Sequence, residues 1–125
     1  MKVTLTDREA DLMDILWERG PSTVSEVLEN LGADLAYTTV LTTLRRLESK
    51  KYIRHDEDGR AHRYSAVIGR DSARRSAVKA LSRKLFKGST ELLLTHLVSD
   101  GELSDADVLR IRRLLASRSK KEKPQ

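Results

Sequence analysis

The polar residues between Leu35 and Lys51 have the chemistry of a nucleic-acid-binding surface. Val40, Leu44 and Leu47 recur at the spacing that places them on one side of a helix, so that side should face a core. The other side carries hydroxyl and guanidinium groups without a carboxylate: Thr38, Thr42, Arg45 and Ser49, flanked by Thr39 and Arg46. Such groups donate hydrogen bonds to phosphates and base edges, whereas carboxylates are repelled by phosphate. The pattern predicts a recognition helix that enters a DNA groove.

The net charge of +5 agrees with a nucleic-acid partner, but the charge is unevenly distributed. Residues 1–34 carry three basic and eight acidic side chains, residues 35–72 carry eight and five, and residues 73–125 carry thirteen and six. The segment with the predicted recognition helix is therefore only mildly basic. General electrostatic attraction would not single this helix out, so its binding must depend on where its side chains lie.

Composition excludes several other classes of protein. The chain of 125 residues has no cysteine, which excludes disulfides, thiolate metal sites and cysteine nucleophiles. No glycine-rich phosphate loop or metalloprotease motif is present, so we expect no enzyme, no catalytic residues and no cofactor. No apolar run approaches the roughly 18 residues of a membrane span, and we expect a soluble, cytoplasmic protein without membrane contact. An aromatic content of only 4% favours burial against a second subunit.

Two shorter helices should precede the predicted recognition helix. Each begins with a threonine followed three residues later by a glutamate, the capping-box pattern, at Thr6 and Glu9 and again at Thr23 and Glu26. Gly20-Pro21 and Gly32 should end them. The acidic residues of the first helix are expected to face solvent. A helix followed by a tight turn and a recognition helix is the helix-turn-helix arrangement.

The period then changes from helical to alternating, which predicts a β-hairpin over residues 52–64. We expect Asp58-Gly59 to form its turn. A hairpin directly after a recognition helix is a wing, in which Arg60 and Arg63 are the predicted DNA contacts. Arg54 remains open, because Asp56, Glu57 and Asp58 weaken the attraction of this segment for phosphate.

A two-residue turn at Asp58-Gly59 would place His55 directly opposite His62. Such a pair could bind a metal or respond to pH, but two ligands do not complete a metal site. We therefore predict no metal centre. Whether the two histidines have a sensing role stays open at this stage.

Residues 71–116 should form three apolar helices separated by glycine turns. They are too short to bury themselves as a separate domain, since chains below about 40 residues rarely fold alone. This predicts a dimerisation region whose apolar contacts are Leu81, Leu85, Leu93, Leu97, Leu109 and Leu114. The expected fold is mainly α with a small β-hairpin wing: a winged helix-turn-helix domain over residues 1–70, the helical dimerisation region over residues 71–116, and a disordered basic tail over residues 117–125.

Several motifs together resemble the penicillinase-repressor family, which includes the methicillin-resistance and copper-responsive repressors. They are Leu-Ala-Tyr-Thr-Thr-Val at 35–40, Arg-Leu at 46–47, Gly-Arg-Ala-His-Arg-Tyr at 59–64, Leu-Phe-Lys-Gly-Ser at 85–89 and Leu-Ser-Asp-Ala-Asp at 103–107. The resemblance runs from Leu5 to about Leu115. It implies a homodimeric winged-helix repressor that binds an inverted-repeat operator in double-stranded DNA.

The resemblance also implies roles for individual residues. The family's DNA-contacting positions fall on Thr38, Thr39, Thr42 and Arg46, whereas Leu41 stands where some relatives carry arginine. In the resistance repressors a signalling protease leads to cleavage at an Asn-Phe pair, and the matching pair here is His96-Leu97. The copper-responsive branch senses through cysteines, which this chain lacks. The inducing signal, the operator sequence and the regulated genes therefore do not follow from the sequence.

Two hypotheses of different classes result. The leading one is a dimeric DNA-binding repressor that inserts two copies of the recognition helix into successive major grooves. The alternative is a winged-helix module that binds a protein, for example in the transcription machinery, through the acidic first helix. Binding to a short specific duplex at moderate salt would distinguish the two.

Overall fold

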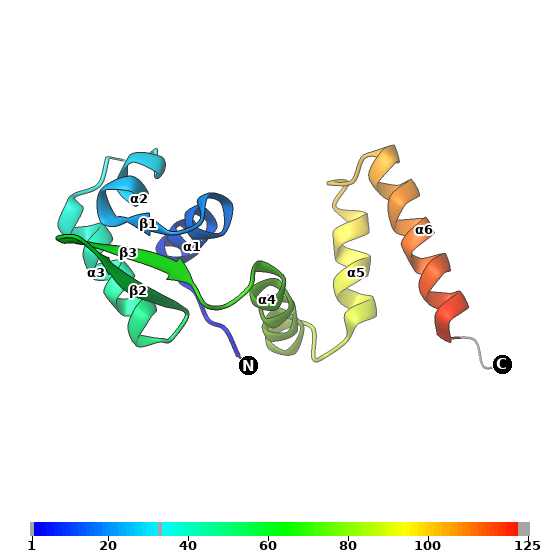
Figure 1. Ribbon diagram of the computed structural model, residues 1–125. Helices are drawn as coiled ribbons and strands as arrows, with labels where there is room; N and C mark the ends of the chain where they lie inside the picture. The colour runs from blue at the N-terminus through cyan, green and yellow to red at the C-terminus, as the bar shows by residue number, and fades with distance from the viewer. Residues whose placement is uncertain (1, 33, 123–125) are drawn as a thin grey trace. The chain divides into compact units, whose positions relative to one another are not determined.

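The N-terminal part of the chain combines three helices with a small sheet. The computed structural model describes residues 2–32 and 34–122 (Figure 1). Its first elements are α1 (Asp7–Arg19), β1 (Ser22–Thr23), α2 (Val24–Asn30), α3 (Tyr37–Ser49), β2 (Ile53–Asp58) and β3 (Ala61–Ala66). The predicted fold class, mainly α with a winged helix-turn-helix, is confirmed. The sequence did not predict β1, which pairs with β3 and extends the hairpin to an antiparallel sheet of order β1-β3-β2.

Both predicted capping boxes are present. The Thr6 hydroxyl accepts the Glu9 amide hydrogen at 3.2 Å, and the Glu9 carboxylate accepts the Thr6 amide hydrogen at 2.8 Å. Thr23 and Glu26 make the same reciprocal pair at the start of α2. Each cap contributes about 1 kcal/mol to helix stability. By contrast, α3 begins after Ala36, whose side chain cannot cap it.

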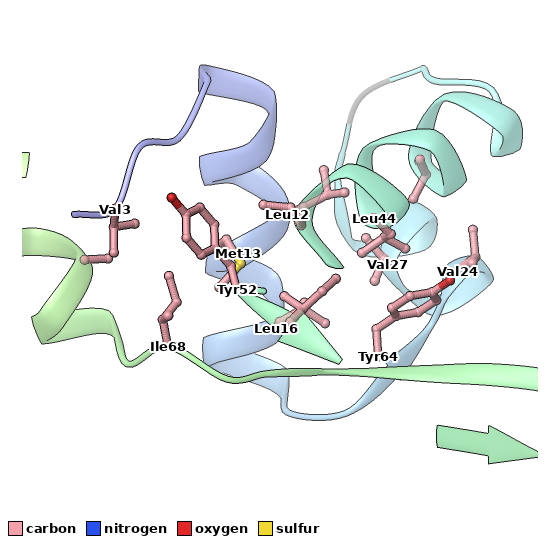
Figure 2. Packing of buried hydrophobic residues seen from close by; sticks show 14 residues of the cluster. Val3, Leu12, Met13, Leu16, Val24, Val27, Leu44, Tyr52, Tyr64 and Ile68 are labelled. Atoms are coloured by element: carbon pink, nitrogen blue, oxygen red, sulfur yellow. The ribbon is translucent and has the colours of Figure 1, made fainter. Parts of the chain in front are cut away.

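One apolar core joins the three helices to the sheet. Figure 2 shows Leu12 and Leu16 of α1, Val27 of α2, Leu44 of α3 and Tyr64 of β3 gathered in the same cluster. On α3 the residues predicted to face inward, Val40, Leu44 and Leu47, are fully buried. Truncating a leucine in such a core typically costs 2–5 kcal/mol. The core therefore determines which side of α3 faces solvent.

The hairpin turns one residue later than expected. His55 pairs with Tyr64, Glu57 with His62 and Asp58 with Ala61, so Gly59 and Arg60 form the turn. Gly59 has φ of 65°, a conformation that glycine adopts without steric cost. Glycine at the first central position suits the tight hairpin turns that match strand twist. The predicted turn at Asp58-Gly59 would have placed Asp58 at the first central position of the turn. That prediction is wrong, because Asp58 pairs with Ala61 as the last residue of β2.

Helix α4 (Arg70–Leu85) begins one residue before the predicted helical region over residues 71–116. The Arg70 guanidinium contacts Asp14 at 3.0 Å and Glu18 at 3.1 Å, and it lies 5.6 Å from the Trp17 ring centroid. These contacts fix the first turn of α4 on α1. The chain divides into two compact units after Val78 rather than after residue 70, because the first turns of α4 pack on the winged helix.

The second unit contains the end of α4 together with α5 (Thr90–Ser99) and α6 (Asp105–Glu122). Helix α6 continues to Glu122 and so includes residues 117–122, which belong to the predicted basic tail. No glycine or proline interrupts residues 105–122, and arginine, alanine and lysine favour helix there. The prediction for residues 123–125 lies outside the described residues.

The second unit leaves most of its large apolar side chains exposed. Of the six leucines predicted for dimerisation, Leu93 is 8% exposed and is packed within the chain. The other five are exposed by 42–70%: Leu81, Leu85, Leu97, Leu109 and Leu114. In the part of the chain that the structure describes, no helix is both long and apolar enough to cross a bilayer.

Candidate nucleic-acid interface

The exposed side of α3 is a crest of hydroxyl and guanidinium groups. At about 100° per residue, Thr38, Thr42 and Arg45 lie opposite the buried row of Val40, Leu44 and Leu47. All three crest residues are exposed. Within the described residues, none of these three side chains has a hydrogen-bond or ion-pair partner. The crest therefore presents donors that are free to bind another molecule.

Arg46 lies to one side of the crest and is partly engaged inside the protein. Its Nε donates to Glu9 Oε2 at 3.1 Å, while Lys50 Nζ donates to Glu9 Oε1 at 2.8 Å. The Glu9 side chain is fully buried. Burial alone would raise the pKa of this carboxyl, but hydrogen bonds from Lys50, the Thr6 amide and Arg46 lower it below the ordinary value.

This network corrects the expectation that the acidic residues of the first helix all face solvent. Glu9 precedes Leu12, Met13 and Leu16 by three, four and seven residues, so it lies on the apolar side of α1. Its carboxylate ties α1 to the second half of α3. Arg46 uses one of the five N–H donors of its guanidinium for this bond, and its side chain is still 48% exposed.

Two hollows lie on opposite sides of the crest. The α1–α3 hollow has a volume of about 340 Å³ and is lined by Arg8, Thr38, Thr39, Thr42, Thr43 and Arg46. The α3–wing hollow is lined by residues of α3, of β1 and α2, and of the hairpin: Tyr37, Leu41, Arg45, Thr23, Val24, Ser25, Arg60, Ala61, His62 and Tyr64. The structure thus brings the predicted Arg60 close to the α3 crest. Sequence reasoning missed Arg8, Tyr37 and His62 as members of this surface.

Arg63 is placed differently from the other predicted contacts. Its guanidinium bonds to Glu26 at 2.9 Å, to Asp58 at 3.0 Å and to the Pro21 carbonyl at 3.3 Å. Hydrogen bonding to Asp58, followed by attraction to Glu26, raises the pKa of Arg63. The cap with Thr23 and the charges of Arg19 and Arg63 lower the pKa of Glu26 to about 2. Arg63 therefore joins the wing to the start of α2.

The two histidines meet even though they are not paired in register. His55 and His62 lie diagonally on one face of the hairpin, and their rings stack with centroids 4.3 Å apart. His55 Nδ1 also contacts the Glu48 carboxylate. Among the residues that the structure describes, no group of three or more potential ligands comes together to hold a metal ion. The pair joins the wing to α3 through Glu48.

A helix-turn-helix with an acid-free exposed face, next to a β-hairpin, defines a winged-helix DNA-binding protein. The penicillinase repressor family matches residues 5–117, and the chain belongs to that family. It is a transcriptional repressor of this type and not an enzyme.

The chain is similar to several transcriptional regulators. It is 44% identical over 110 residues to the transcriptional regulator BlaI of Mycobacterium tuberculosis, covering 85% of this chain and 80% of that protein. It is 24% identical over 122 residues to the penicillinase repressor of Staphylococcus aureus, covering 96% and 97%. The solution structure of the DNA-binding domain of the repressor BlaI aligns with a TM-score of 0.50 at 27% identity, over 56% of this chain and 90% of that domain.

Proposed function

We propose that the chain acts in the cytoplasm as a homodimer that binds an inverted-repeat operator in double-stranded DNA and blocks transcription. The observation that carries the proposal is the free crest of α3, where Thr38, Thr42 and Arg45 are exposed and have no partner within the described residues. A helix of this kind fits the major groove, in which hydroxyl and guanidinium donors distinguish base pairs.

The residues on either side of the crest would position the helix on the DNA backbone. Thr39 and Arg46 line the α1–α3 hollow, and Arg60 lines the α3–wing hollow. Arg63 would reach phosphate only by exchanging its bonds to Glu26 and Asp58. We therefore assign Arg63 mainly to the attachment of the wing and keep the other three as DNA contacts.

Dimerisation would occur through the second unit. Leu81, Leu85, Leu97, Leu109 and Leu114 are all exposed there. Large apolar side chains that are exposed together mark interaction surfaces. A second copy of the chain would cover these apolar side chains. It would also supply the second recognition helix that an inverted repeat requires.

The protein-interaction alternative rests on the acidic side of α1. Asp14 and Glu18 of that helix remain exposed, but Arg70 pairs with both of them, and Glu9 is buried. Arg70 therefore offsets part of the acidic charge on this side of α1, which favours the DNA-binding proposal.

The crest can be tested by the double variant Thr38→Ala with Thr42→Ala. The probe is a duplex selected from a random library by the full-length wild-type protein. Each lost base contact is worth about 1–3 kcal/mol, so we expect gel-shift affinity to fall at least about tenfold. Discrimination against duplexes with single mismatches should fall as well. Thr4→Ala, an exposed threonine outside α3, is the matched control. Unchanged discrimination in the double variant would remove both hydroxyls from the reading surface.

A further inference from the structure

The α1–α3 hollow contains an arginine that the proposed reading helix does not supply. Arg8 lies in the first turn of α1, a helix whose other charged side chains are acidic except for Arg19. It is half-buried and lines the hollow with Thr38, Thr39, Thr42 and Arg46. Within the described residues Arg8 has no hydrogen-bond or ion-pair partner. An arginine without a partner among the described residues thus lines the same open hollow as a second arginine, Arg46.

The charge of this hollow is not neutralised from within. The one buried carboxylate close to it, Glu9, is already shared by Arg46 and Lys50. Asp7 does not line the hollow. Arg8 therefore adds positive charge that no described carboxylate pairs with directly, and the threonine hydroxyls add neutral donors. Two guanidiniums with hydroxyl donors form a set that suits the oxygens of a phosphate.

The position of the hollow indicates which phosphate it would hold. Helical spacing places Thr39 and Arg46 to one side of the crest, whereas Tyr37 and Leu41 of the α3–wing hollow lie on the other side. When a helix enters the major groove, its crest faces base edges and its sides face the sugar-phosphate backbones. A cation beside the crest therefore meets backbone phosphate rather than bases.

We infer that the α1–α3 hollow is a phosphate site in which Arg8 of α1 and Arg46 of α3 bind one backbone phosphate of the operator. The inference rests on the proposed DNA-binding function. It makes α1 a part of the DNA interface, although its overall charge is negative. Because phosphate contacts carry no sequence information, Arg8 contributes affinity and orientation, not base preference.

The test uses the full-length protein and the duplex that it selects from a random library. Binding is measured by fluorescence anisotropy over a range of NaCl concentrations for wild type, Arg8→Gln and Arg8→Lys. Losing one phosphate contact per protomer should reduce the slope of log affinity against log salt by about 0.9, or roughly 1.8 for a dimer. Arg8→Lys keeps the charge and should retain most of the slope. Arg75→Gln removes an exposed charge outside both hollows and is the control.

The possible outcomes separate this inference from the proposed function. If wild type selects no duplex, the proposed function fails. If wild type selects a duplex, and folded Arg8→Gln shows the same slope of log affinity against log salt as wild type, the phosphate site is overturned. A second arm titrates inorganic phosphate against the DNA-free protein at constant ionic strength. A further outcome is that phosphate stabilises the fold of wild type but not that of Arg8→Gln, while the salt slope of DNA binding is the same for both proteins. That result would assign the hollow to a free anion and contradict the assignment to a backbone phosphate.

Discussion

Replacing Leu97 and Leu114 together by aspartate is expected to make the chain monomeric and to weaken binding to the selected duplex by more than about 100-fold. The two side chains are 54% and 70% exposed in the second unit, so neither substitution opens a core. Two charges in a proposed apolar interface would have to be desolvated without partners, which opposes association. A monomer then loses the gain from linked binding of two half-sites, which reaches 10²–10⁴-fold.

Analytical ultracentrifugation would give the oligomeric state, and gel shift at fixed salt would give the affinity. Val67→Asp is the matched control, because Val67 is 56% exposed but lies in the first unit. The control should stay dimeric. A double variant that remains dimeric would show that the exposed leucines of the second unit do not hold the copies together.

The variant Glu9→Ala should destabilise the winged-helix unit by about 2–4 kcal/mol. It removes one half of a capping box, worth about 1 kcal/mol, and the acceptor of charge-assisted bonds from Arg46 and Lys50. The expected loss of about 2–4 kcal/mol is smaller than the sum of the cap and the two charge-assisted bonds. Arg46 and Lys50 are partly exposed, so water can replace the carboxylate as their partner. Most domains have only 5–15 kcal/mol of stability in total, so the loss is large.

Chemical denaturation monitored by circular dichroism would measure this difference, with Glu29→Ala as control because Glu29 is exposed on α2. The more conservative Glu9→Gln keeps the capping geometry and removes only the charge. Since the pKa of Glu9 is lowered from 4.5 on folding, its stabilising effect is complete above that pH and is lost as the pH falls through its folded value. The stability gap between wild type and Glu9→Gln should therefore narrow at acidic pH. A gap independent of pH would contradict a charged role for Glu9.

Local patterns determine the parts of the fold that could be predicted. The buried row of α3 follows from the spacing of Val40, Leu44 and Leu47 alone, and each capping box needs only four consecutive residues. The wing could be predicted because the spacing of apolar residues changes from helical to alternating after Lys51. The strand register could not be predicted, because turns at Asp58-Gly59 and Gly59-Arg60 differ by one residue and only the backbone conformation of Gly59 decides between them.

The interface also depends on contacts between residues far apart in the chain. Arg46 and Lys50 meet Glu9 across 37 and 41 residues, and Arg63 meets Glu26 across 37. The capping box alone accounted for a glutamate at position 9. Its position on the apolar side of α1, which buries the carboxylate, was therefore overlooked. Arg8 was missed because its neighbours in sequence are acidic and indicated a surface that repels DNA. In the fold those acidic residues do not line the hollow, whereas Arg8 does.

Selection of duplexes from a random library by the full-length wild-type protein tests most directly whether this chain reads DNA as a symmetric dimer through the α3 crest. We expect an enriched inverted repeat whose half-sites are centred about one or a whole number of helical turns apart, roughly 34–36 Å per turn. Enrichment of a single half-site, or of no sequence above background at moderate salt, would contradict it.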